Sequence, residues 1–269
     1  MNMLQYKTEN ITVFQSALYK TTSAIIESDH AMVMTDPCWL PEEVETIRNY
    51  VNQNKGNREL FIVYTHSDFD HIIGAGAFPE AKVIASEAFQ SNPHKKEILN
   101  QIDEFDQKYY LERSYVHEYP SVDIVVTKEG QTLELEDITL TFYSSPGHTN
   151  DGVFTVVEPM GIFLSGVYLS DVEFPFIFDS YQSYQKTLER AAYILKQHNI
   201  SIHVPGHGST TDKHEEMMDR LHFSQYYVHN LLNEDVDLEQ ELYQKYSFFE
   251  GMKSIHESNK ALASPELKK

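Results

Sequence analysis

The segment Leu60–His71 reads LFIVYTHSDFDH and is the most informative stretch of the sequence. It begins with five apolar or aromatic residues, Leu60–Tyr64, a pattern typical of a strand buried on both faces. Two histidines and two aspartates follow within six positions, at His66, Asp68, Asp70 and His71. Neutral imidazole and carboxylate oxygen bind divalent metals, and a tight loop holds such ligands together at little entropic cost. The segment therefore predicts a metal site at the end of a buried strand.

Two later histidines stand in glycine-rich turns, where strands are expected to end. His148 lies in Ser145–Thr149, which reads SPGHT, and His207 lies in Pro205–Gly208, which reads PGHG. Glycine beside a histidine lets the backbone turn sharply and leaves room around a ligand. A single His/Asp cluster is often only a solvated turn, and these two turns strengthen the metal interpretation. His203, in the strand before His207, is expected to pack or to support a ligand rather than to bind a metal.

Strand and helix patterns alternate around these motifs. Strands are predicted at Ile11–Tyr19, Ser23–Glu27, Ala31–Thr35, Leu60–Tyr64, Lys82–Ala85, Asp123–Val126, Thr132–Leu135, Ile138–Tyr143, Val153–Val157, Ile162–Ser165 and Ile202–Val204. Helices are predicted at Pro41–Asn52, Ile72–Phe78, Tyr181–His198 and Asp212–Asn233. Because each half of the chain contains strands and helices, we predict a layered α/β protein, with two sheets packed face to face and helices outside.

The sequence contains no internal repeat and no long linker, so residues 1–269 are predicted to form a single domain. Within it, residues 87–118 are charged and predict a helical insertion, and further helices are expected over residues 211–250. The tail Lys253–Lys269 is polar and is expected to be frayed. The insertion and the C-terminal helices could form the surface of a homodimer.

The net negative charge of the chain disfavours some classes of binding partner. The chain has 21 Lys and Arg against 41 Asp and Glu, a net charge of −20. A field of that sign repels nucleic-acid phosphates and anionic membranes, so neither is an expected partner. Cys38 is the one cysteine, which suits a reducing compartment. No apolar signal segment begins the chain, and Gly161–Leu169 is too short to span a bilayer. We therefore expect a cytoplasmic protein with a small-molecule substrate.

Taken in order, these motifs resemble those of the metallo-β-lactamase superfamily over Ile11–Gly208. His66–His71 resembles its His-x-His-x-Asp-His signature, and the two Pro-Gly-His turns resemble its later metal histidines. Asp36 resembles its buried structural aspartate, and Phe163–Gly166 resembles the strand that precedes its bridging aspartate. The resemblance implies a four-layer αββα sandwich of two mixed β-sheets flanked by helices.

The resemblance also implies a hydrolase that uses two metal ions, with Asp70 acting in catalysis as well as in metal binding. One metal would be held by His66, Asp68 and His148, and the other by Asp70, His71 and His207. In the family a hydroxide on the metals attacks a carbonyl or phosphoryl group of the substrate. The expected reaction is therefore hydrolysis of a small ester, lactone, thioester or phosphoester.

Two positions depart from the family pattern. Asp68 replaces a histidine, and its hard carboxylate moves the metal preference from zinc, the first expectation, toward iron or manganese. This variant resembles the metal motif of flavodiiron proteins, so a di-iron redox protein is an alternative function. Val167 stands where the family places the bridging aspartate, and valine cannot bind a metal. Two further alternatives follow: an enzyme with one metal instead of two, and a metal-impaired binding protein. Asp171, four residues on, is the candidate replacement ligand.

Several aromatic residues and histidines near the motifs allow two interpretations. Tyr168 is a candidate donor to an oxyanion, with core packing as the alternative. Phe174, Phe176 and Phe178 alternate with other apolar residues and predict either core packing or the wall of a substrate pocket. Eight further histidines lie in polar surroundings and are expected at the surface: His30, His94, His117, His198, His214, His222, His229 and His256.

Overall fold

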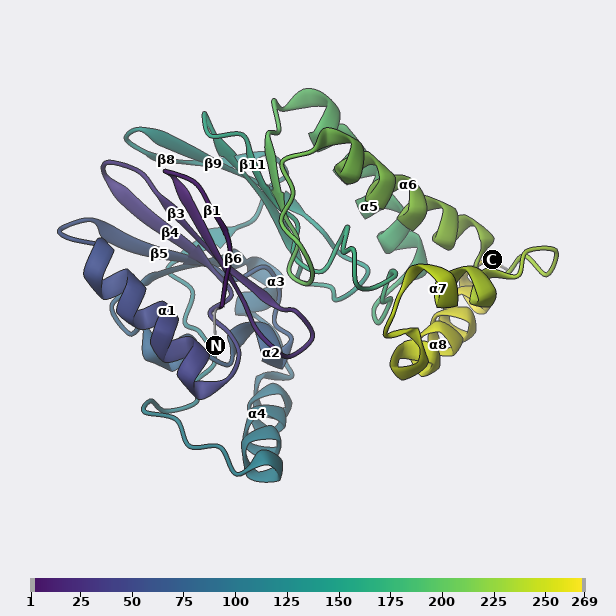
Figure 1. Ribbon diagram of the computed structural model, residues 1–269, viewed down its shortest axis with the longest axis horizontal. Helices are drawn as coiled ribbons and strands as arrows, with labels where there is room; N and C mark the ends of the chain where they lie inside the picture. The colour runs from purple at the N-terminus through teal and green to yellow at the C-terminus, as the bar shows by residue number, and fades with distance from the viewer. Residues whose placement is uncertain (1–2, 268–269) are drawn as a thin grey trace.

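Two β-sheets face each other in the computed structural model, which describes residues 3–267 (Figure 1). One sheet has seven strands in the order β1-β2-β3-β4-β5-β6-β7, and the other has five in the order β12-β11-β10-β9-β8. In the first sheet the pairs from β1 to β4 are antiparallel and those from β4 to β7 are parallel. In the second sheet the β11–β12 pair is parallel and the others are antiparallel. Both sheets are mixed, as predicted.

The described strands and helices have the following bounds. The strands are β1 (Leu4–Lys7), β2 (Ile11–Gln15), β3 (Thr22–Glu27), β4 (Ala31–Thr35), β5 (Glu59–Val63), β6 (Lys82–Ser86), β7 (Ile124–Val126), β8 (Gln131–Leu135), β9 (Ile138–Ser144), β10 (Val153–Glu158), β11 (Ile162–Leu164) and β12 (Ile202–Val204). The helices are α1 (Pro41–Asn54), α2 (Phe69–Ile72), α3 (Glu87–Gln90), α4 (Lys95–Tyr109), α5 (Tyr181–Gln197), α6 (His214–Asn230), α7 (Leu238–Lys245) and α8 (Phe249–Leu267).

The side chains of the central strands alternate between two hydrophobic layers. Val33 and Phe61 face the space between the sheets, whereas Met34 and Ile62 face the helices on the outer side of the seven-stranded sheet. This alternation follows from the two-residue period of a strand, and it explains why parallel strands buried on both faces are continuous apolar runs.

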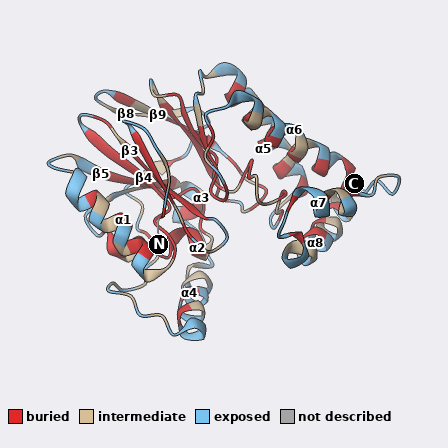
Figure 2. Ribbon diagram, in the orientation of Figure 1, coloured by how far each residue is buried: buried red, intermediate tan, exposed pale blue. Residues whose placement is uncertain are grey.

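Three hydrophobic clusters separate four layers of secondary structure. One cluster lies between the sheets, and a second lies between the seven-stranded sheet and helices α1, α3 and α4. The third joins the five-stranded sheet to α5, α6, α7 and α8. Figure 2 shows the buried strands inside and the exposed outer faces of α1, α5 and α6. The predicted αββα sandwich is therefore confirmed. Within residues 3–267, no helix combines the length and the apolar character needed to cross a bilayer.

Three local predictions were wrong in their boundaries, and β1 was not predicted. The strand predicted at Ile11–Tyr19 is β2, which ends at Gln15, and Tyr19 adopts the left-handed backbone conformation, with φ 49°. The helix predicted at Ile72–Phe78 begins earlier, at Phe69, and ends at Ile72. The insertion is also less helical than predicted, since after α4 it continues as irregular chain from Tyr110.

The polar tail is not frayed but forms α8, a helix of 19 residues; residues 268–269 lie outside the described part. Besides apolar residues such as Phe249 and Ala263, its buried side carries His256 and Asn259, which are both fully buried. Asn259 Nδ2 donates to the Tyr227 hydroxyl at 2.9 Å, and His256 Nδ1 lies 3.0 Å from the same oxygen. His256, expected at the surface, is therefore part of the interior, where the Tyr227 hydroxyl contacts its Nδ1 while its Nε2 has no hydrogen-bond partner.

Candidate metal site

The expected ligands meet at one edge of the two sheets. His66, Asp68, Asp70 and His71 follow β5, His148 lies between β9 and β10, and His207 follows β12. The carboxyl ends of β5 and β12 and the turn between β9 and β10 reach this edge together. Their side chains form two groups, each with its ligand atoms within 4.8 Å of one another: His66, Asp68 and His148, and then Asp70, His71 and His207.

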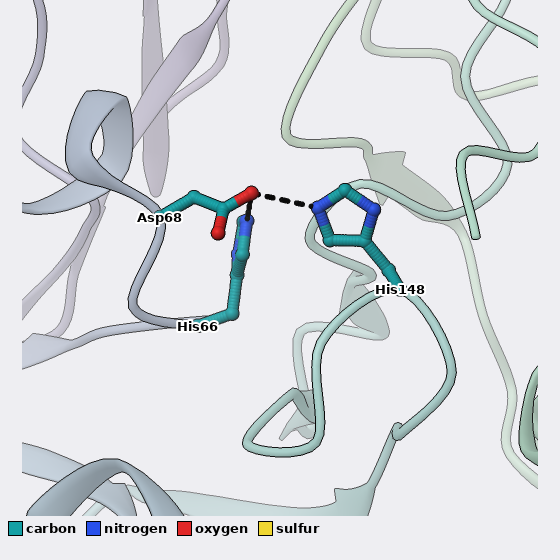
Figure 3. Close-up of side chains that lie close together, drawn as sticks. All are labelled: His66, Asp68 and His148. Carbon is teal, nitrogen blue, oxygen red and sulfur yellow. Dashed lines mark hydrogen bonds and ion pairs between the residues drawn. The ribbon is translucent and has the colours of Figure 1, made fainter. Parts of the chain in front are cut away.

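Asp68 lies between two imidazole rings in the first group (Figure 3). Its Oδ2 is 2.9 Å from Nε2 of His148 and 3.6 Å from Nε2 of His66. Nε2 of His66 is buried and has no hydrogen-bond partner. Burial would raise the pKa of Asp68, but the imidazoles of His148 and His66 lower it well below its usual value.

In the second group, two imidazole nitrogens face each other beside a carboxylate. Nε2 of His71 is 3.0 Å from Nε2 of His207. Asp70 Oδ2 lies 3.4 Å from the first of these nitrogens and 3.7 Å from the second. Burial alone would lower the pKa of His71, but the carboxylates of Asp70 and Asp36 raise it to about 9. The second group therefore attracts a cation.

The other ring nitrogen of each histidine is held by an oxygen acceptor. Nδ1 of His71 donates to Asp36 Oδ2 at 2.9 Å, and Nδ1 of His66 lies 3.0 Å from the Thr65 hydroxyl. Nδ1 of His148 is 2.9 Å from the Phe176 carbonyl, and Nδ1 of His207 is 3.0 Å from the Tyr19 carbonyl. Carbonyl and carboxylate oxygens only accept, and the Thr65 hydroxyl is already donating to Asp36 at 2.6 Å. In the neutral form, the form that binds a metal, all four rings are therefore assigned the tautomer with hydrogen on Nδ1.

This tautomer explains why the two groups fit a metal ion. Each Nε2 then carries a lone pair, and these lone pairs point at a carboxylate oxygen or at one another. Without a cation between them such contacts are repulsive, whereas a divalent metal uses the same lone pairs as ligands. The rings of His66 and His71 are 4.1 Å apart between centroids, so the two groups adjoin. The residues present therefore suit two neighbouring divalent metals.

Asp36, expected to be a structural aspartate, fixes the base of the site. It is buried, and its Oδ1 accepts from the backbone nitrogen of Thr65 at 2.9 Å. Its Oδ2 accepts from the Thr65 hydroxyl and from His71 Nδ1. One carboxylate thus positions both the start of the metal loop and one ring of the second group.

Gly147 positions His148 and gives a testable prediction. Its φ is +124°, and a Cβ there would lie 2.4 Å from the backbone of Tyr184. We expect Gly147→Ala to lower the free energy of unfolding by about 2–4 kcal/mol, because strain and overpacking add together. Gly130→Ala is the matched control, since Gly130 has φ +70° but no atom within 4 Å of a Cβ, and it should cost about 1 kcal/mol. Chemical denaturation measures both values, and equal losses would contradict the steric argument.

Asp171, Tyr168 and His203, which the sequence placed near the site, lie outside both metal groups. Asp171 is in neither metal group: its Oδ1 accepts from the backbone nitrogen of Ser209 at 2.7 Å, and its Oδ2 is 3.6 Å from Arg220. The Tyr168 hydroxyl donates to the Pro146 carbonyl at 2.8 Å, so it supports the turn of His148. His203 is buried, with Nε2 2.8 Å from the Ser165 hydroxyl, as expected for a packing residue.

Glu173 is a site residue that the sequence did not single out. Its side chain is largely buried, and Oε1 lies 3.8 Å from Nδ1 of His207. Burial raises the pKa of Glu173, and the nearby carboxylate of Asp70 raises it further. Asp171 was the expected substitute for the aspartate missing at Val167, but Glu173, two residues further on, is the carboxylate that faces the site.

A second residue that the sequence missed is Asn259 of α8, which supports the first group from a distance. Its Oδ1 accepts from the backbone nitrogen of Ile177 at 3.0 Å, and its Nδ2 donates to the Pro175 carbonyl at 2.6 Å. These two bonds flank Phe176, whose carbonyl holds the His148 ring. The C-terminal helix thereby helps to fix the orientation of a candidate ligand.

A cavity of about 450 Å³ opens directly on the two groups. Asp68, Asp70, His148 and His207 reach its wall, as do Val167 and Glu173. Pockets of this size accommodate small molecules. Phe176 and Phe178 line the cavity, whereas Phe174 packs in the core against Tyr227. Core packing therefore describes Phe174, and a position on a pocket wall describes Phe176 and Phe178.

The comparisons with known proteins agree with this geometry. The sequence model of the metallo-beta-lactamase superfamily matches residues 22–207. The chain is similar to a stereoselective inverting sec-alkylsulfatase from Pseudomonas sp., with a TM-score of 0.69 and 12% identity over 88% of this chain and 43% of that one. It is also similar to a metallo-beta-lactamase from Pontibacter korlensis, with a TM-score of 0.60 and 16% identity over 84% of this chain and 98% of that one.

A third similar structure is an archaeal superfamily protein from Sulfolobus tokodaii, with a TM-score of 0.56 and 16% identity over 89% of this chain and 95% of that one. This chain spans less than half the length of the sec-alkylsulfatase. No curated protein matches the sequence. At these identities the structural likeness shows the fold, whereas the family match covers most of the chain and includes every residue of the two groups. The chain therefore belongs to the metallo-β-lactamase superfamily.

Proposed function

We propose that the protein is a hydrolase that holds two divalent metals and cleaves a small ester, lactone, thioester or phosphoester. The observation that carries this proposal is the common orientation of four histidines, each with Nδ1 held by an oxygen and Nε2 directed into one of two adjoining groups. Divalent metals bound there would supply Lewis acidity and a water nucleophile at neutral pH.

The chain's own residues would orient the reactants around those groups. Asp70 lines the cavity, and its carboxylate would accept a hydrogen bond from the attacking water as well as bind a metal. Glu173 is the other carboxylate on the same wall near His207, and it would move a proton to or from the departing oxygen or sulfur. Water adds to the carbonyl carbon or the phosphorus, and the alcohol or thiol leaves with a proton.

Metal removal tests this proposal. We expect dialysis against a chelator to abolish hydrolysis of a panel of aryl esters, thioesters, lactones and phosphodiesters, and zinc, manganese or ferrous iron, added separately, to restore it. The metal that restores activity identifies the preferred ion, for which zinc is the first expectation and the carboxylate of Asp68 favours iron or manganese. Hydrolysis that survives full metal removal would reject the proposal. Oxygen consumption by the iron form, with no hydrolysis by any form, would favour the redox alternative.

A further inference from the structure

The cavity beside the metal groups has an apolar wall formed by the start of the C-terminal helix. Phe248 precedes α8, and Gly251, Met252 and Ile255 follow on it. Residues at this spacing lie on one face of a helix, so they form a continuous strip along the cavity. The neighbouring face, with His256 and Asn259, is buried, which holds the strip in place.

The opposite walls of the cavity are also rich in aromatic rings. Tyr19, Trp39 and Phe69 line it from the N-terminal half of the chain. Phe178 connects the apolar walls to the metal groups, because its ring centroid is 5.0 Å from that of His148. Phe178 and Phe248 are 52% and 62% exposed, although burial would favour both rings. Large apolar side chains left in contact with solvent around a cavity typically mark a ligand-binding site.

The charges on the cavity wall disfavour an anionic ligand in this part of the site. Asp68, Asp70 and Glu173 line the cavity, and Lys20 is the one Lys or Arg among its described lining residues. These three carboxylates would balance most of the positive charge of two bound metals. The strip of residues on α8 carries no charge. The group that fits beside α8 is therefore uncharged and apolar.

We propose that this cavity binds an uncharged alkyl or aryl group of the substrate, and that Gly251 sets the length of group that fits. The inference deepens the proposed function, since it places the scissile bond at the metal groups and the apolar group against α8. Glycine in a helix costs about 1 kcal/mol relative to alanine. A Cβ at Gly251 would have no atom within 4 Å, so packing does not require glycine there. Gly251 also lines the cavity, so a side chain at this position would narrow it.

Hydrolysis of p-nitrophenyl esters of increasing acyl length tests the inference. In the wild type we expect kcat/KM to rise from acetate to octanoate by about fourfold for each methylene that is buried. Gly251→Leu adds a branched side chain at a position where a Cβ would meet no atom within 4 Å. We expect it to lower the ratio of kcat/KM for octanoate to that for acetate by at least about tenfold, since two or more methylenes no longer fit. Gly251→Ala, the matched control for helix stability, should change the ratio by about fourfold or less.

A binding measurement separates this inference from the proposed function. Isothermal titration calorimetry with alkan-1-ols from butanol to decanol should show affinity that rises with chain length in the wild type and much less in Gly251→Leu. That result, with no hydrolysis of the esters or of any other substrate of the panel, would support the apolar site and reject the hydrolase. Hydrolysis that depends neither on acyl length nor on Gly251→Leu, with alkanol affinities equal in both proteins, would support the hydrolase and overturn the inference.

Discussion

Replacing His148 by alanine is expected to remove one of the two metals and to lower kcat/KM for the best substrate by about a thousandfold or more. His148 is the ligand that brings the second half of the chain to the His66–Asp68 loop, with its Nε2 2.9 Å from Asp68 Oδ2. Without it, Asp68 and His66 alone remain in the first group, and two ligands from one short loop bind a divalent metal weakly.

The control for this prediction is His222→Ala, because His222 lies exposed on α6 and outside both groups. It should keep the metal content and the activity of the wild type. Thermal unfolding of the chelated proteins shows whether His148→Ala is still folded. A folded His148→Ala protein that retains both metals and full turnover would contradict the assignment of the first group.

Asp36→Asn is expected to weaken metal binding at the second group by about 10–100-fold and to lower turnover accordingly. The carboxylate of Asp36 accepts from His71 Nδ1 at 2.9 Å, which leaves Nε2 of that ring free to bind a metal. An amide nitrogen in place of Oδ2 would donate instead of accept, so the ring would move its hydrogen to Nε2, the atom that the metal needs. Asparagine therefore preserves the shape of the site but reverses one hydrogen bond.

Asp106→Asn provides a matched control, since Asp106 is also a buried aspartate but pairs with Arg113, away from both groups. It should lower the stability without loss of metal. Metal affinity is measured by competition with a chromogenic chelator. Wild-type affinity in Asp36→Asn would show that Asp36 has no part in setting the tautomer of His71.

The layered fold could be predicted because its strands have a distinctive pattern. Leu60–Tyr64 and Ala31–Thr35 are continuous runs of mostly apolar residues, and both became central parallel strands buried on their two faces. Helix α8 could not be predicted in the same way. Its buried face carries His256 and Asn259, which are buried only because Tyr227 and the 175–177 backbone supply partners far away in the sequence. Apolar periodicity cannot reveal a face of that kind.

The six candidate ligands could be selected from the sequence because each stands in a short motif, and the structure brings them into two groups; that they bind metal stays a prediction. Their supporting acceptors had no such signal, because the carbonyls of Tyr19 and Phe176 are backbone atoms that any residue carries. Asp171 was selected because it follows Val167 closely in the sequence, and in the structure it is in neither metal group. Asp171 Oδ1 accepts from the backbone nitrogen of Ser209 in the turn after His207, whereas Glu173 lines the cavity.

We propose that the two groups each hold a divalent metal although Val167 occupies the position of the expected bridging aspartate. The metal content per chain is measured by elemental mass spectrometry of protein purified without added metal or chelator. We expect about two metals per chain in the wild type and about one in His148→Ala. One metal per wild-type chain would contradict the two-metal arrangement, and a wild-type chain without metal would contradict the metal site itself.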